Sequence, residues 1–137
     1  MDSEILKGIM LKETDALKKL LSLLEEQYKL LLGNKIFELE GIVSKIQEVN
    51  KEIAEIEVER RKVTAGKAMS DLIRESKNID LESSYRNIKK LVSELQLQKD
   101  TNDALIRQGL GFSTRMLNII TPDRNTQTYN AYGKLRK

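Results

Sequence analysis

Apolar residues recur every three or four positions over most of this chain, and this spacing constrains the fold more than any other feature. Six of the eight residues in a first series are apolar, at positions 6, 10, 13, 17, 20, 24, 27 and 31. A second series is apolar except at Arg60, at positions 39, 42, 46, 49, 53, 56, 60 and 63. Alternating steps of three and four place such residues on one face of an α-helix. We therefore expect an all-α fold.

Turn-forming residues divide the pattern into three long helices and a short one. Gly33 and Asn34 both tolerate a left-handed backbone, and two long helices joined by so short a loop must be antiparallel. The pattern weakens between positions 65 and 80. We expect Asp80 to cap the last helix and Pro122 to end it. The helices are expected at about 4–32, 35–64, 68–77 and 81–120.

These elements predict an elongated antiparallel bundle over residues 1–120 and a flexible basic tail over residues 121–137. Residues 1–120 contain 20 of the 24 Lys and Arg residues and 20 of the 21 Asp and Glu residues, so the tail accounts for the whole net charge of +3. A nucleic-acid-binding protein carries a basic stripe on its folded surface. The balanced bundle therefore argues against DNA or RNA as a partner.

The residue types required for most catalytic and metal-binding sites are missing from the sequence. It contains no Cys and no His, and neither a GxSxG nor a GxxxxGK[ST] motif. Glu55, Glu57 and Glu59 alternate with the apolar series and lie among Lys and Arg, which is typical of a solvated, ion-paired helix face. We expect a protein that is not an enzyme and has no cofactor and no metal site.

The sequence also bears on the compartment. The N-terminal residues MDSEILKGIM lack a basic leader and an apolar segment of signal-peptide type. No apolar segment approaches the roughly 20 residues that cross a bilayer. The net charge of +3 over residues 121–137 falls short of the clusters of about four to eight basic residues that are typical of anionic-lipid patches. We expect a cytoplasmic protein without membrane insertion.

The last long helix has a polar middle and an unusually wide apolar end. Gln98 and Asn102 lie on its apolar face, and we expect them to form a structural hydrogen bond. Beyond them lies a set that we call the C-terminal arc: Leu105, Ile106, Leu110, Phe112, Met116, Leu117 and Ile120. At 100° per residue the arc spans nearly half of the helix circumference, more than the roughly 100° of a one-sided helix.

Another helix must cover part of the C-terminal arc, and the sequence leaves three alternatives for that helix. Two neighbouring helices of the same chain could do so, as could a second copy in a homo-oligomer. The third cover is an amphipathic helix from a partner, bound in a groove where a flexible Met and a rigid Phe act as anchors.

Three segments of the chain resemble the FlgN-type flagellar export chaperones. The first is LLLGNKIFELEGIV at positions 30–43, a leucine-rich helix end followed by a turn and a second helix. The second is NDALIRQ at positions 102–108, followed by Phe112 and by Met116 and Leu117. The third is YNAYGKL at positions 129–135. The likeness covers nearly the whole chain, with Gly41 and the weak region at 65–80 as departures.

The resemblance implies a cytoplasmic chaperone without enzymatic activity. Its partners would be the flagellar hook-associated proteins, which form the hook-filament junction, and the gate of the flagellar type III export apparatus. It would bind the C-terminal helical segments of its cargo, and our helical angles assign the C-terminal arc as the cargo groove. Tyr129 and Tyr132 would help to clamp cargo or to dock at the gate, unless they belong to a terminus without contacts.

Two other classes of function stay open on the sequence alone. The chain could be a structural coiled-coil homo-oligomer without cargo, whose oligomer interface is the C-terminal arc. A weaker alternative is a nucleic-acid-binding protein that uses the basic tail, for which salt-dependent binding would be the signature.

Overall fold

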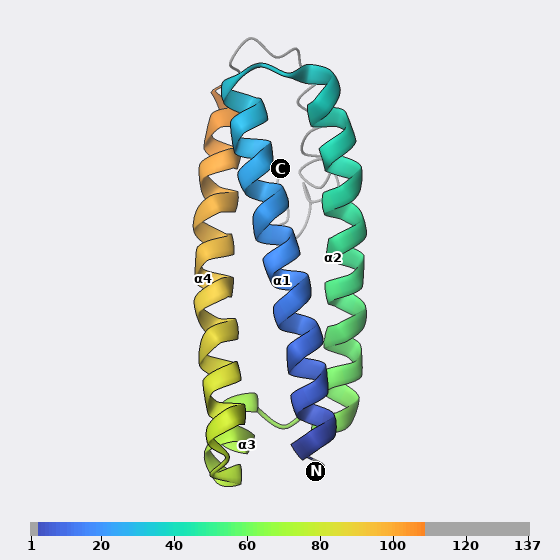
Figure 1. The fold of residues 1–137 in the computed structure, drawn as a ribbon, viewed down its shortest axis with the longest axis vertical. Coiled ribbons are helices and arrows are strands. Elements are labelled where there is room, and N and C mark those ends of the chain that lie inside the picture. The colour runs from blue at the N-terminus through green and yellow to red at the C-terminus, as the bar shows by residue number, and fades with distance from the viewer. Residues whose placement is uncertain (1–2, 109–137) are drawn as a thin grey trace, which may run out of the picture. The chain divides into compact units, whose positions relative to one another are not determined.

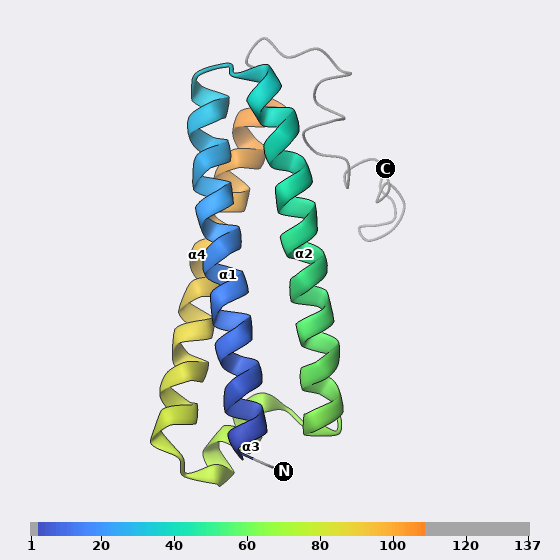
Figure 2. The ribbon, with the colours of Figure 1, turned by 45° about the vertical axis from the view of Figure 1, so that its right-hand side comes forward.

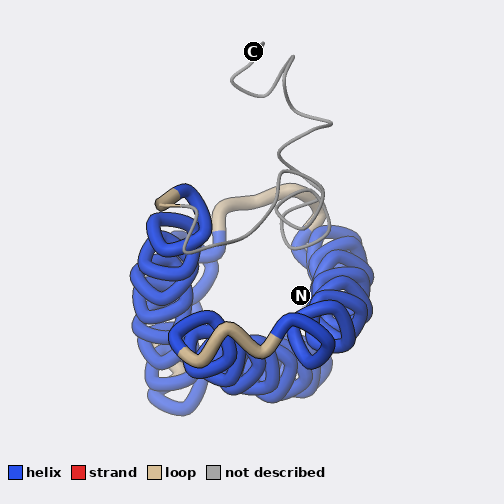
Figure 3. Tube along the Cα trace, turned by 90° about the horizontal axis from the view of Figure 1, so that it is seen from above, coloured by secondary structure: helices blue, strands red, loops and turns tan. Residues whose placement is uncertain are grey.

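The computed structural model of the chain describes residues 3–108, which form four α-helices and no strand (Figures 1 and 3). The helices are α1 (Ser3–Leu32), α2 (Ile36–Thr64), α3 (Met69–Ser76) and α4 (Ile79–Arg107). This confirms the expected all-α fold of three long helices and one short helix. The expected continuation to position 120 and the tail at 121–137 lie outside the described residues.

Contacts between helix segments divide the chain into two compact units, and α1, α2 and α4 each contribute a segment to both. The first unit consists of Met1–Ser22 and Gln47–Leu97, and the second of Leu23–Ile46 and Gln98–Lys137. The predicted apolar faces supply buried residues to each unit. Leu6, Met10 and Leu17 are buried in the first, and Leu24, Leu31 and Leu39 in the second.

In the first unit, ion pairs show that α1 and α2 run antiparallel. The Lys12 Nζ lies 3.2 Å from a Glu59 carboxylate oxygen, and the Lys19 Nζ lies 3.2 Å from a Glu52 carboxylate oxygen. The residue number therefore rises along α1 as it falls along α2. Between these two helices lies an apolar cluster of Ile9, Ala16 and Ile56, against which Ile53 and Val63 pack. Figure 2 shows α3 between the end of α2 and the start of α4.

In the second unit, residues from α1, α2 and α4 share one apolar cluster. Its buried members are Leu31, Leu39, Ile42 and Ile106. Leu23, Leu30, Ile46 and Leu105 pack against them and are partly buried. This core therefore holds the last described turns of α4 against the ends of α1 and α2 that adjoin the turn between them.

The turn from α1 to α2 is a Schellman motif with Asn34 in the left-handed conformation. The Lys35 N–H donates to the Leu30 carbonyl at 3.0 Å, and the Asn34 N–H donates to the Leu31 carbonyl at 3.2 Å. Asn34 has φ 53°, which Asn tolerates better than most residues. The motif satisfies carbonyls at the end of α1 and returns the chain directly into α2.

The cap of α4 differs from the expected one. Asn78, not Asp80, caps this helix: its Oδ1 accepts the N–H groups of Asp80 at 3.0 Å and Leu81 at 3.2 Å. Lys77 ends α3 in the left-handed conformation, with φ 52°. The helix α4 therefore begins two residues earlier than expected. Asp80 lies in its first turn, where the helix dipole stabilises a negatively charged carboxylate.

Candidate functional site

The C-terminal arc is only partly within the described residues. Ile106 is 1% exposed and belongs to the apolar cluster of the second unit, and Leu105 packs against that cluster. These two side chains are thus covered by α1 and α2 of their own unit. Five arc residues and both predicted docking tyrosines lie outside the described residues: Leu110, Phe112, Met116, Leu117, Ile120, Tyr129 and Tyr132.

A buried amide network anchors α4 just before the arc. Asn102 is 1% exposed, and its Nδ2 donates to the Leu24 carbonyl at 2.8 Å and to Gln27 Oε1 at 2.9 Å. Its Oδ1 accepts a hydrogen bond from Gln98 Nε2 at 3.0 Å. The expected bond between Gln98 and Asn102 is confirmed. Gln27, one of the two polar residues of the first apolar series, is a hydrogen-bond partner of Asn102 that the sequence did not identify.

Three large apolar side chains beside the turn from α1 to α2 are exposed. We call these residues the turn patch: Leu32 is 58% exposed, Ile36 38% and Phe37 88%. All three belong to the second unit. An aromatic side chain left in water gives up about 2 kcal/mol of burial energy. The turn patch is therefore one candidate for a contact with a partner, and Ile79 at 81% and Leu97 at 70% are exposed apolar residues elsewhere in the described range.

Sequence reasoning missed the turn patch, although one signal was available. Phe37 is two positions before Leu39, so it lies off the apolar series that begins there. Leu32 directly follows Leu31, the last member of the first series. Large apolar residues outside a packing series are the ones that a helix pair leaves in solvent.

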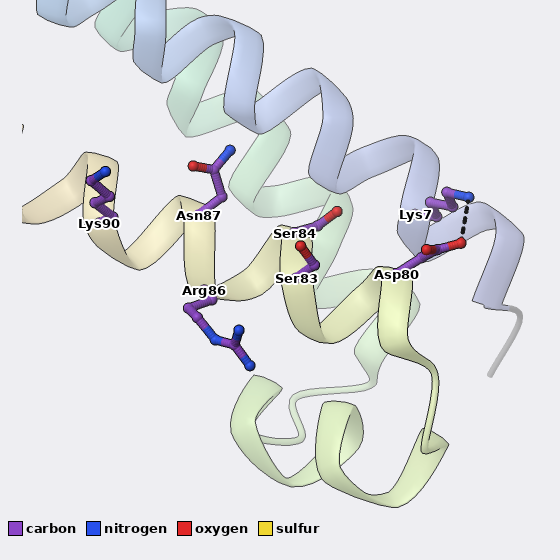
Figure 4. Close-up of a pocket in the computed structure, with 7 residues that line it drawn as sticks. All are labelled: Lys7, Asp80, Ser83, Ser84, Arg86, Asn87 and Lys90. Carbon is purple, nitrogen blue, oxygen red and sulfur yellow. Dashed lines mark hydrogen bonds and ion pairs between the residues drawn. The ribbon is translucent and has the colours of Figure 1, made fainter.

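A shallow hollow of about 560 Å³ lies on the first unit (Figure 4). Its lining is polar and comes from α1 and α4: Lys7, Asp80, Ser83, Ser84, Arg86, Asn87 and Lys90. Lys7 pairs with Asp80 at 3.4 Å, and Arg86 pairs with Glu82 at 2.8 Å, so most of its charge is neutralised. None of the lining side chains is buried, and the hollow offers no fixed donor for a ligand.

A partly buried ion pair crosses from α1 to α2 in the first unit. Glu13 is 8% exposed, and its Oε1 lies 3.8 Å from the Nε of Arg60, which has no hydrogen-bond partner. Burial raises the pKa of the Glu13 carboxyl above its ordinary value; Arg60 opposes this change, and Glu57 adds to it. Both residues occupy polar positions of the apolar series, so the pair is part of the helix packing.

Neither metal ligands nor a membrane span can be assigned in the part of the chain that the structure describes. Over residues 3–108, His, Cys, Asp and Glu side chains form no group of three or more that could hold a metal ion. No helix in this range has both the length and the apolar character to cross a bilayer.

Comparison with known proteins gives one match. A family model described as FlgN protein matches residues 1–137, which is the entire chain. Neither a curated protein nor a solved structure gives a significant match.

Proposed function

The chain belongs to the FlgN family, whose members are flagellar export chaperones, and we propose that its cargo is the hook-associated proteins of the hook-filament junction. It binds their C-terminal helical segments in the cytoplasm, prevents their premature association and delivers them to the flagellar type III export apparatus. The family match over residues 1–137 is the observation that carries this proposal.

The cargo contact that we propose is the C-terminal arc beyond its two covered residues. Leu105 and Ile106 anchor the start of the arc in the core of the second unit. The other arc residues follow in the sequence: Leu110, Phe112, Met116, Leu117 and Ile120. Such a series suits an amphipathic cargo helix that is disordered when free and folds on binding.

Holding and releasing such a cargo requires no catalysis. Ordering a disordered segment opposes binding, so the net affinity is limited and a competitor can displace the cargo. We propose that the export gate is this competitor and that Tyr129 and Tyr132 contribute to clamping cargo or docking at the gate. This assignment agrees with a chaperone family that is not known for enzymatic activity.

A titration with a synthetic peptide from the C-terminal segment of a hook-associated protein tests the proposal. We expect a 1:1 complex by light scattering, with a complex mass that does not change with concentration. Met116→Glu and Leu117→Glu should each weaken binding at least about tenfold, because a charge at an apolar anchor must be desolvated.

Val58→Glu is the matched control, since Val58 is 50% exposed on α2 in the first unit and has no assigned role. It should leave peptide binding unchanged. Absence of binding by the unmodified chain, or equal weakening by all three variants, would contradict the cargo assignment. A mass that rises with concentration and blocks peptide binding would favour the alternative, a coiled-coil homo-oligomer without cargo.

A further inference from the structure

We propose that the buried amides of Gln27 and Asn102 set the axial register of α4 on α1. Asn102 bonds Gln27, and four positions later in both helices Ile106 shares a cluster with Leu31. The two helices therefore run parallel in the second unit. Among positions of α4 that differ by seven residues, the amide pair selects one. This role goes beyond the proposed function and requires no cargo.

Apolar packing alone does not distinguish positions of α4 that differ by seven residues. Buried residues of α4 recur at this spacing: Leu81, Ile88, Leu95 and Asn102. Buried residues of α1 do the same: Met10, Leu17, Leu24 and Leu31. A slip of seven residues moves α4 by about 10 Å along its axis and replaces one aliphatic contact by another. In these two sets, Asn102 is the member that such a slip mismatches.

Asn102 meets a side-chain amide at one height of α1. Its Nδ2 donates to the Leu24 carbonyl at 2.8 Å and to Gln27 Oε1 at 2.9 Å. Seven positions before Gln27, α1 has Leu20 instead. Seven positions earlier again it has Glu13, which faces Arg60 of α2 at 3.8 Å. A slipped α4 would therefore lack the amide partner for Asn102.

Burial makes such a mismatch costly. Gln27 is 5% exposed and Asn102 1%, so neither amide can turn to water for a replacement bond. In the observed register the Asn102 amide is fully bonded, because its Oδ1 also accepts from Gln98 Nε2 at 3.0 Å. A single buried asparagine in an otherwise apolar helix interface fixes register in this way, at some cost in stability.

The connection before α4 restricts its register less than the turn before α2 does. Residues 33–35 alone join α1 to α2, whereas residues 65–78 join α2 to α4 and include α3 and left-handed residues at both of its ends. The ion pair of Lys7 and Asp80 also joins α1 to α4, but its side chains are 37% and 71% exposed. Exposed pairs of this kind contribute little to stability.

Spin labels on Glu25→Cys and Arg107→Cys report the register, since the chain has no native Cys and both positions are exposed in the second unit. The unmodified pair of helices should give one distance. Gln27→Leu with Asn102→Leu should stay folded, because both partners become apolar together. It should add a second distance that differs by about 5 to 10 Å, the result of a slip of seven residues.

Asn50→Leu with Asn87→Leu is the matched control, since it replaces two exposed amides by leucine. It should keep the single distance. A single, unchanged distance in the variant of Gln27 and Asn102 would show that apolar packing or α3 fixes the register, which overturns the proposal. A second distance that also appears between singly labelled chains comes from association and would overturn it as well.

Moving the asparagine along α4 gives a directional test. Leu95→Asn with Asn102→Leu places the amide seven positions earlier, so α4 should slide until this amide meets Gln27. The main label distance should then lengthen by about 5 to 10 Å. Adding Leu20→Gln and Gln27→Leu moves the partner by the same seven positions and should restore the original distance.

The direction of this shift decides the outcome even if the leucine variant does not fold. A main distance that stays unchanged when the asparagine moves alone would contradict the assigned role. So would a lengthened distance that the two additional substitutions in α1 do not reverse.

Discussion

Glu13 is a buried carboxyl whose ionisation works against the packing of α1 on α2. Burial raises its pKa, and the opposing effect of Arg60 at 3.8 Å does not cancel this rise. The folded protein therefore holds a proton on Glu13 more strongly than the unfolded chain. The resulting stabilisation is fully present below the ordinary Glu pKa of about 4.3 and is lost as the pH rises through the folded pKa.

We accordingly expect Glu13→Gln to become more stable, relative to the unmodified protein, as the pH rises from about 4 to 7. The glutamine keeps an oxygen facing Arg60 and cannot ionise. The measurement is urea unfolding at several pH values, with Glu55→Gln as a matched control at an exposed position of α2. A stability difference that is constant or decreases over this range would contradict the assigned role of Glu13.

Asn102 supplies the hydrogen bonds that fix α4 in the second unit, so its removal should be costly. Asn102→Ala leaves the buried Gln27 Oε1 without its donor at 2.9 Å and opens a small cavity. We expect a loss of about 2 kcal/mol in the free energy of unfolding, and less than about 0.5 kcal/mol for the exposed Asn50→Ala. Denaturant unfolding measures both.

A double-mutant cycle with Gln27→Ala tests whether the Asn102 effect comes from this bond. The two substitutions should be non-additive by more than about 0.5 kcal/mol, because each removes the same interaction. Additive losses would show that the Asn102 effect does not come from its bond to Gln27 but from packing or from its bonds to the Leu24 carbonyl and Gln98.

At the scale of elements, the start of α4 is capped by Asn78 and not by the expected Asp80. Asn78 bonds the first free N–H groups of the helix, whereas Asp80 makes an exposed ion pair with Lys7 at 3.4 Å. Asn78→Ala should therefore cost about 1 kcal/mol, and Asp80→Ala about half of that or less. Thermal or urea unfolding of the two variants gives the order, and the reverse order would mean that Asp80 is the cap.

The apolar series identified most of the buried residues but not which residues of other helices they contact. Leu39, Ile42, Val49 and Ile56 are all buried, as the second series predicts. After Asn102, the next residue of the apolar series could be three or four positions later. The series was expected to continue at Leu105, but the fully buried residue is Ile106. Periodicity describes one helix at a time, and the choice between adjacent apolar residues depends on the helix packed opposite.

The same limit explains what was missed in the candidate site. The exposure of Phe37 depends on which surfaces of α1 and α2 meet beside the turn, and a repeat within one helix does not contain that information. Likewise, Glu13 and Arg60 each interrupt an apolar series, and only the packing of α1 on α2 shows that they face each other. A cap depends on neighbouring residues only, yet the expected cap was wrong. Lys77 is in the left-handed conformation, and α4 begins at Ile79, two residues earlier than expected.

At the scale of the whole molecule, charge separates the bundle from the residues after it. In the first unit, exposed Lys residues of α1 pair with Glu residues of α2, as Lys12 does with Glu59 and Lys19 with Glu52. Residues 123–137 instead carry four basic residues and one acidic residue. A partner that binds this tail should therefore present acidic groups beside pockets for Tyr129 and Tyr132.

Truncation after Pro122 tests whether the tail binds cargo, the export gate or neither. If the tail contributes a second contact, its removal should weaken binding to one of the two partners about tenfold and leave the other unchanged. The loss should shrink at high salt, where exposed charges are screened over a few ångströms. Titrations of a hook-associated peptide and of the cytoplasmic part of the export gate, each at low and high salt, measure this. Tyr129→Ala with Tyr132→Ala in the full-length chain separates the aromatic contribution from the charge, and Thr126→Ala is the control. If the shortened chain binds both partners as tightly as the full chain, the tail has no docking role.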